Sequence, residues 1–213
     1  MRPPEDWRRA RATLAIAGVT AAAWLLASYF GLGNFLAGWA GFIPARVEGL
    51  ESGEGRVPLI LTPLTATLVH AGMVHLFFNL MILLLCGRSV EPLIGLKAFV
   101  TLYVVGAYAA TAAQWAVHMG DAVPMVGASG AISAVLGAYA MLFGRNRVRI
   151  ANPTVAFWLN ALWLAAAWIG LQLLVGFTFQ TAGARIAVAA HIGGFIAGLA
   201  LAKPLLLLRW RGA

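Results

Sequence analysis

The sequence predicts an all-α integral membrane protein built from six membrane-spanning helices. Of its 213 residues, 62% are hydrophobic and only 10% are charged, and the mean hydropathy is +0.85. A soluble domain typically carries about a quarter charged residues, so this composition excludes an ordinary soluble fold. Apolar stretches close to the length of about 20 residues that a bilayer requires recur along the chain.

Six apolar segments follow one another along the chain. The expected spans are Ala12–Tyr29, Leu64–Cys86, Leu96–Val117, Ala128–Phe143, Val155–Val175 and Ile186–Leu208. The fourth holds only about 16 residues, which suffices if its first residue lies below the membrane surface and lines a water-filled recess. The only cysteine, Cys86, rules out an intramolecular disulfide, and we expect it to be buried near the end of the second helix.

These spans define a simple domain organisation. Residues 1–11 form a short basic N-terminal segment, residues 12–208 one membrane domain, and residues 209–213 a tail. Arginines precede the first apolar run, but no small-residue cleavage site follows it, so we expect that run to stay in place as a transmembrane helix.

The longest connection, residues 31–63, contains glycine, proline and three glutamates. A loop of this length usually has a structure or a role of its own. Its segment Asn34–Ile43 is apolar and aromatic but too short to cross a bilayer. We expect this segment to lie in the membrane interface, where tryptophan is favoured, and substrate gating is the alternative.

The basic residues predict the orientation. With six spans, one side of the membrane receives both termini, the turn at residues 87–95, the loop at residues 144–152 and 12 of the 15 Lys and Arg residues. The other side receives only Arg46, Arg56 and Arg185. The positive-inside rule then places both termini in the cytoplasm. Because these residues lie at the ends of apolar segments, the net charge of +8 does not indicate a nucleic-acid partner.

A serine lies where a loop leads into the fourth span, in the sequence Gly127-Ala128-Ser129-Gly130. The N–H groups at a helix N-terminus lack partners and carry a partial positive charge, which suits a developing oxyanion. The flanking glycines permit close approach of the backbone. Taken alone, the same four residues are equally typical of a tight helix–helix contact.

Two polar residues share one face of the second span. His75 and Asn79 are four residues apart, and both side chains can donate a hydrogen bond. Donors held in a region of low dielectric constant are what an oxyanion hole requires. Hydrogen bonds between helices are the alternative. His70 lies nearer the outer end, and we expect it to make a structural hydrogen bond.

The sixth span opens with a histidine and two glycines. His191, Gly194 and Gly198 lie on one helix face, and the two glycines allow another helix to come close. Small residues follow a similar spacing on the fourth span: Ser129, Ser133 and Gly137. Docking of these two faces would bring His191 towards Ser129 across 62 residues of sequence.

This pairing predicts a Ser–His dyad, with Ser129 as the nucleophile and His191 as the general base. A third, acidic member is not expected, because Glu91 and Asp121 are placed in loops. The chain lacks the His-Glu-x-x-His pattern of a zinc protease and lacks two buried aspartates, which disfavours metalloproteases and aspartyl proteases.

Taken together and in this order, these residues resemble the rhomboid family of intramembrane serine proteases. The shared motifs are His70…His75-xxx-Asn79, Gly127-Ala128-Ser129-Gly130 and Ala190-His191-xx-Gly194-xxx-Gly198, and the likeness extends from about Phe30 to Leu201. Further features similar to bacterial members are Val90-Glu91 with Gly95 and Tyr103, Ile43-Pro44, and Trp168…Gln172.

The resemblance implies a six-helix protease core whose active site opens to the extracytoplasmic side. It implies that His75, Asn79 and the N–H groups of Ser129 and Ala128 form the oxyanion hole. Substrates would be transmembrane proteins cut in or near their helices, with membrane lipids as surroundings and with no cofactor or metal. A bacterial inner membrane is the expected location, and the sequence predicts no oligomeric state.

Two positions depart from the family pattern. Many members carry a tyrosine four residues after the serine, stacked on the catalytic histidine, where this chain has Ser133. Some bacterial members also carry a Trp-Arg pair that is lacking in residues 31–63. These departures leave a catalytically weak or inactive membrane-protein binder as the alternative function. The buried histidines also suggest a small transporter or proton channel, which the lack of charged residues at membrane depth and of a broken-helix repeat disfavours.

Overall fold

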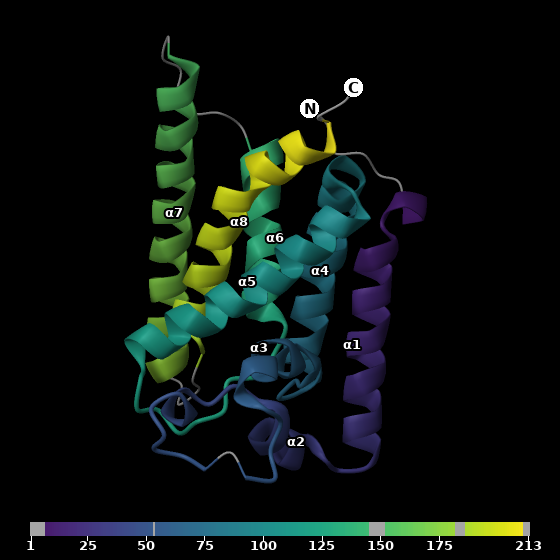
Figure 1. The fold of residues 1–213 in the computed structure, drawn as a ribbon, viewed down its shortest axis with the longest axis vertical. Helices are drawn as coiled ribbons and strands as arrows, with labels where there is room; N and C mark the ends of the chain where they lie inside the picture. The colour runs from purple at the N-terminus through teal and green to yellow at the C-terminus, as the bar shows by residue number, and fades with distance from the viewer. Residues whose placement is uncertain (1–6, 53, 145–151, 182–185, 211–213) are drawn as a thin grey trace.

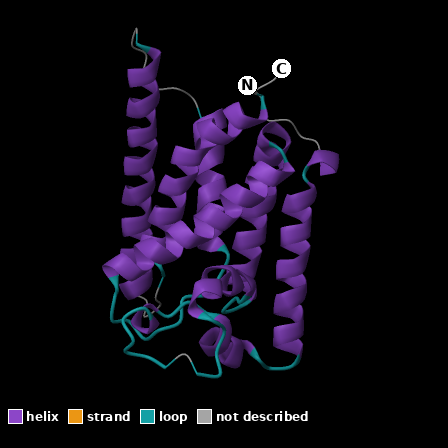
Figure 2. Cartoon of the chain, viewed as in Figure 1, coloured by secondary structure: helices purple, strands orange, loops and turns teal. Residues whose placement is uncertain are grey.

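The computed structural model describes residues 7–52, 54–144, 152–181 and 186–210 (Figure 1). Within these residues the chain forms eight α-helices and no strand (Figure 2). The helices are α1 (Arg11–Tyr29), α2 (Gly33–Ala40), α3 (Thr62–Thr65), α4 (Met73–Ile94), α5 (Leu96–Val117), α6 (Ser129–Phe143), α7 (Pro153–Thr181) and α8 (Val188–Arg209). The predicted all-α membrane architecture is confirmed.

Five helices, α1, α4, α5, α7 and α8, are long and apolar enough to cross a membrane. The remaining apolar helix in the bundle, α6, has 15 residues. At 1.5 Å per residue it extends roughly 22 Å, less than the hydrocarbon core of about 30 Å. It is therefore short, as predicted. Helices α1, α5, α6 and α8 begin and end within two residues of the predicted spans.

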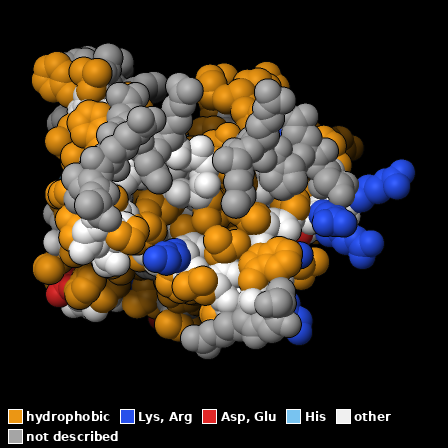
Figure 3. Space-filling view, turned by 90° about the horizontal axis from the view of Figure 1, so that it is seen from above, with side chains coloured by type: hydrophobic (Ala, Val, Ile, Leu, Met, Phe, Trp, Pro, Cys, Tyr) orange, Lys and Arg blue, Asp and Glu red, His pale blue; other side chains and the backbone are white. Residues whose placement is uncertain are grey.

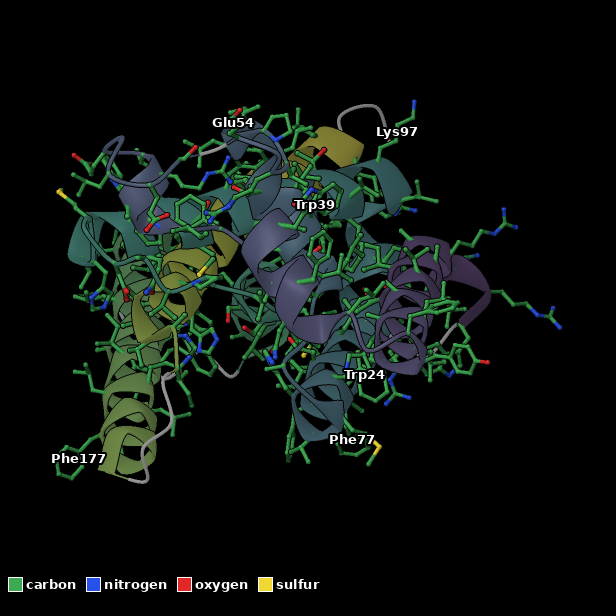
Figure 4. All side chains as sticks on the ribbon, turned by 90° about the horizontal axis from the view of Figure 1, so that it is seen from below. Trp24, Trp39, Glu54, Phe77, Lys97 and Phe177 are labelled. Atoms are coloured by element: carbon green, nitrogen blue, oxygen red, sulfur yellow. The ribbon has the colours of Figure 1, made fainter. Side chains whose placement is uncertain are left out.

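The helices place both ends of the described chain at the same end of the bundle (Figure 1). Helices α1 and α7 lie at the two outer edges, and α6 and α8 lie between them. The short helices α2 and α3 lie at the opposite end. Figure 3 looks down on the face near the termini, where Lys and Arg side chains project from the surface. Figure 4 shows the opposite face, with Trp39 on α2 and Glu54 in the loop.

Helix α4 differs from its prediction, which ran from Leu64 to Cys86. It begins at Met73 and continues to Ile94, with Pro92 inside it. The chain before α4 forms separate short helical turns, and Val69 is extended, so the apolar residues there do not belong to the span. The predicted turn at residues 87–95 is wrong, because these residues continue the helix up to Gly95, which has φ +89°. Cys86 is buried, but in the middle of α4 rather than near its end.

The placement of Glu91 in a loop was also wrong. It lies in α4 with no exposed surface, and its carboxylate accepts hydrogen bonds from the N–H groups of Ala12 and Thr13, both at 2.8 Å, and from Thr13 Oγ at 2.7 Å. A carboxylate at a helix N-terminus satisfies N–H groups that have no partner within the helix. Glu91 therefore fixes the start of α1 against α4.

The predicted docking of α6 against α8 is confirmed, and further small residues join the predicted ones at the contact. A Cβ atom on Gly194 would collide with the carbonyl oxygen of Gly130, and one on Gly198 would collide with that of Ala134. Gly137 packs in the same way against the backbone at Phe195. The small-residue face of α6 therefore includes Gly130 and Ala134, next to the predicted serines, and the two backbones approach closely.

Candidate active site

The close approach of α6 and α8 brings together the predicted nucleophile and base. Ser129 is the first residue of α6, and His191 is the fourth residue of α8. The Nε2 atom of His191 lies 2.8 Å from Ser129 Oγ, and both residues are half-buried. A serine hydroxyl at this distance can donate its proton to a neutral imidazole nitrogen.

Gly127 lets the chain turn into α6 immediately beside His75. Its φ of +111° lies in the region that only glycine adopts readily, and a Cβ atom here would lie 2.7 Å from His75 Nε2. The Gly127 N–H donates to the carbonyl of Ala66 at 2.9 Å. The His75 ring therefore lies against the backbone that leads to Ser129, where an oxyanion donor is expected.

His70 makes a structural hydrogen bond, as predicted. Its Nε2 atom accepts a long hydrogen bond, 3.4 Å, from the N–H of Ala128. Burial, with a smaller contribution from His75, lowers the pKa of His70 to about 4, so its ring is neutral and able to accept at neutral pH. In this state the Ala128 N–H points towards His70.

Asn79 lies one turn along α4 from His75. Its Nδ2 atom donates to the carbonyl oxygen of His75 at 2.8 Å, and its Oδ1 atom is buried without a hydrogen-bond partner among the described residues. One amide N–H remains for another acceptor, since an amide nitrogen carries two. No hydrogen bond between Asn79 and Ser129 occurs in the described part of the chain.

Ser133 does not take the place of a stacking aromatic residue. Its hydroxyl donates to the carbonyl oxygen of Ser129 at 2.8 Å, a bond along its own helix. Besides Ser129, Trp168 of α7 reaches His191, and its Nε1 donates to the His191 carbonyl oxygen at 3.3 Å. Trp168 was noted in the sequence only as part of the family likeness.

The long first loop holds the segment before Ser129, a role that sequence patterns did not predict. Phe42 and Met125 exchange two backbone hydrogen bonds of 3.0 and 2.7 Å, and the Ala45 N–H donates to the Asp121 carbonyl at 3.0 Å. These bonds are made by backbone atoms, which any residue carries, so side-chain identity does not reveal them. The loop is tied to α5 in turn, where Trp115 Nε1 donates to Glu48 Oε1 at 2.8 Å.

A small hollow borders Ser129, with walls built from α5, the turn before α4 and the first residues of α6. Its lining includes Ala66, Thr67, Ala107, Ala110, Thr111 and Gly130. The volume of the hollow is small, so only a small group can enter. In the described part of the chain, no three His, Cys, Asp or Glu side chains are grouped so that they could hold a metal ion.

Comparison with known proteins adds an independent observation. The family model of the Rhomboid domain matches residues 60–208, which include Ser129 and His191. The chain is 29% identical over 173 residues to Rhomboid protease GlpG of Pectobacterium atrosepticum, covering 76% of this chain and 57% of that protein. It is 31% identical over 139 residues to RHOMBOID-like protein 5 of Arabidopsis thaliana, covering 65% and 42%. The chain spans about half the length of the curated relatives it matches.

Proposed function

This chain belongs to the rhomboid family, and we propose that it is an intramembrane serine endopeptidase that uses a dyad of Ser129 and His191. The observation that carries the proposal is the distance of 2.8 Å between His191 Nε2 and Ser129 Oγ at the start of α6. The similarity to proteins named Rhomboid protease GlpG supports the same activity.

In the proposed reaction, His191 Nε2 accepts the proton of Ser129 Oγ as that oxygen attacks the carbonyl carbon of a peptide bond. The imidazolium then donates the proton to the departing amine. A water molecule, deprotonated by His191, hydrolyses the acyl-enzyme and regenerates Ser129. This role requires the resting tautomer to carry its proton on Nδ1, leaving Nε2 as the acceptor.

The oxyanion would form beside the first turn of α6, where N–H groups lack partners within the helix. We assign the N–H of Ser129 and the ring of His75 as its main donors, because His75 lies against Gly127. Asn79 would contribute its second amide N–H. Ala128 would contribute only after releasing His70, to which its N–H is bonded in the resting state.

The substrates we propose are transmembrane proteins whose helices unwind locally at the dyad. The hollow beside Ser129 favours a small side chain at the cleaved bond. The excess of Lys and Arg at the end that carries the termini supports a cytoplasmic location for that end. Ser129 would then open to the extracytoplasmic side of a bacterial inner membrane.

Cleavage of a purified transmembrane substrate in detergent or liposomes, followed on a gel, tests this function. The wild type should cleave, and Ser129→Ala should lose at least about 1,000-fold in rate, as nucleophile removal does in serine proteases. The matched control is Ser133→Ala, one turn along the same helix, which should keep most of the activity. Equal cleavage by wild type and Ser129→Ala would refute the proposal. A folded wild type that binds but never cleaves the substrate would favour a non-catalytic binder.

A further inference from the structure

His191 lies in the first turn of α8, where the N–H of Val188 donates to the Ile186 carbonyl at 2.8 Å and the N–H of His191 donates to the Ala187 carbonyl at 3.2 Å. Helix α8 begins at Val188, and the preceding residue, Ala187, makes no side-chain capping bond. Uncapped first turns fray because their N–H groups have no partner within the helix. A general base must nevertheless be held to within a fraction of an ångström, since small displacements slow a reaction about 100-fold.

Ser129 of α6 contacts the His191 ring, and α5 and α6 also pack closely against the glycine backbone of α8. Gly193 packs on Ala109 and Ala113 of α5, and Gly194 packs on Gly130 of α6. Ser133, which also lies beside Gly194, uses its hydroxyl on the Ser129 carbonyl. These contacts set the position of the α8 axis. The side of α8 that faces α7 is positioned by a different kind of contact.

Trp168 of α7 makes this contact with α8. Its Nε1 donates to the His191 carbonyl oxygen at 3.3 Å, and its ring is stacked on Phe195, with centroids 5.0 Å apart and planes inclined by 17°. In an α-helix the carbonyl of His191 also faces the N–H of Phe195, one turn later. One rigid side chain therefore contacts both ends of the turn that carries the base. Phe195 is 3% exposed, so its stacked ring is fixed by packing.

We propose that Trp168 is a positioning residue that holds His191 in line with Ser129, and that this contact orients the base in a chain with Ser133 at the position of the usual aromatic residue. The inference rests on the proposed protease function. It also makes the docking of α7 on α8 a condition for an assembled dyad. Trp168 itself touches neither the substrate nor the reacting atoms in this assignment.

The test is the rate constant for labelling of Ser129 by a fluorophosphonate, measured on purified full-length protein. Trp168→Phe keeps a ring on Phe195 and removes the Nε1–H, so labelling should slow about fivefold, the effect of one neutral hydrogen bond. Trp168→Ala removes both contacts and should slow labelling about 100-fold. Trp158→Phe is the matched control, because Trp158 lies on the same helix with 62% of its surface exposed, and it should label at the wild-type rate.

Steady-state cleavage separates positioning from a general loss of structure. The Trp168 variants should show a lower kcat with KM within about twofold of wild type, since substrate binding does not involve the imidazole. Thermal unfolding of Trp168→Phe should match that of the wild type. If Trp168→Ala does not fold, Phe195→Leu replaces it, because this variant keeps an apolar side chain and removes the stacked ring.

Wild-type rates of labelling and cleavage in Trp168→Phe and in the second variant would overturn the positioning role. So would rate losses that only follow the loss of folded protein or an increase in KM. Failure of the proposed function looks different, because the folded wild type would then not be labelled at all. Labelling of the wild type but not of Ser129→Ala, with no effect at Trp168, would retain the protease and reject this inference alone.

Discussion

Gly127 shows how one residue without a side chain shapes the candidate site. Its positive φ turns the chain into α6, and its missing Cβ leaves room for the His75 ring. The sequence predicted a close backbone approach at this glycine, and the structure identifies His75 as the group that approaches. The backbone conformation and the ring contact are separate requirements, and both exclude a larger residue.

Gly127→Ala should therefore abolish or strongly reduce labelling of Ser129. An alanine at this position destabilises the folded protein by roughly 1–2 kcal/mol, because its Cβ disfavours a left-handed backbone. Its Cβ also displaces the His75 ring. We expect at least about a tenfold loss in labelling rate. Gly120→Ala is the control in the same loop, since the atom nearest to its added Cβ is Leu50 Cδ1 at 4.0 Å. Equal labelling of both variants would contradict this account of Gly127.

The sequence pointed to the residues of the candidate site through their types, their spacing and their likeness to a known family. His75 and Asn79 share a helix face, and His191 lies on a glycine-lined face that could dock only against another small-residue face. Their catalytic roles stay a prediction. What spacing could not supply was hydrogen-bond direction, such as the Ala128 N–H pointing to His70. Such details depend on loop geometry that no periodic pattern encodes.

At the scale of elements, α5 was predicted to the residue and α4 was displaced by eight or nine residues. Gly95, with φ +89°, separates the end of α4 from the start of α5. The residues before α4 are apolar but form short turns, and apolar composition does not distinguish them from a span. Pro92 lies inside α4, and the helix continues past it to Ile94.

The corrected α4 gives Glu91 a structural role at the contact with α1. Glu91→Gln should lower the stability of the protein by about 2–3 kcal/mol, because a charged acceptor of three hydrogen bonds is replaced by a group with one acceptor atom. Glu91 lies 16 residues beyond His75, roughly 24 Å along the helix, so the labelling rate per folded molecule should stay unchanged. Denaturation in mixed detergent measures the stability.

The matched control for that experiment is Glu54→Gln, because Glu54 is exposed in the first loop. Its stability should equal that of the wild type. If Glu91→Gln were as stable as Glu54→Gln, the carboxylate would not be what holds the start of α1. If Glu91→Gln lost labelling without losing stability, the purely structural role of Glu91 would be wrong.

At the scale of the whole molecule, the even number of predicted spans agrees with the position of both ends of the described chain at one end of the bundle (Figure 1). Hydropathy and the lack of charge were sufficient to predict the all-α membrane fold. The packing of the helices against one another could not be predicted from hydropathy, because lipid-facing and protein-facing residues are equally apolar. The small-residue faces of α6 and α8 were the sequence feature that predicted which two helices pack together.

The proposed orientation predicts which loops face the cytoplasm. A membrane-impermeant maleimide added to intact cells should label Gly120→Cys, in the loop before Ser129, and should not label Lys97→Cys until the membrane is opened. Both positions are exposed, Lys97 at the start of α5 and Gly120 three residues beyond its end. The native Cys86 is buried and should not react in either variant. The reverse labelling pattern would invert the topology.

Ser129 is proposed to be a nucleophile activated by His191, and fluorophosphonate labelling tests this activation without the need for a known substrate. We expect rapid labelling of the wild type, none of Ser129→Ala and at least about a 1,000-fold slower reaction of His191→Ala. His118→Ala, at the exposed end of α5, should label like the wild type. Unlabelled but folded wild type, or full labelling of His191→Ala, would contradict the account.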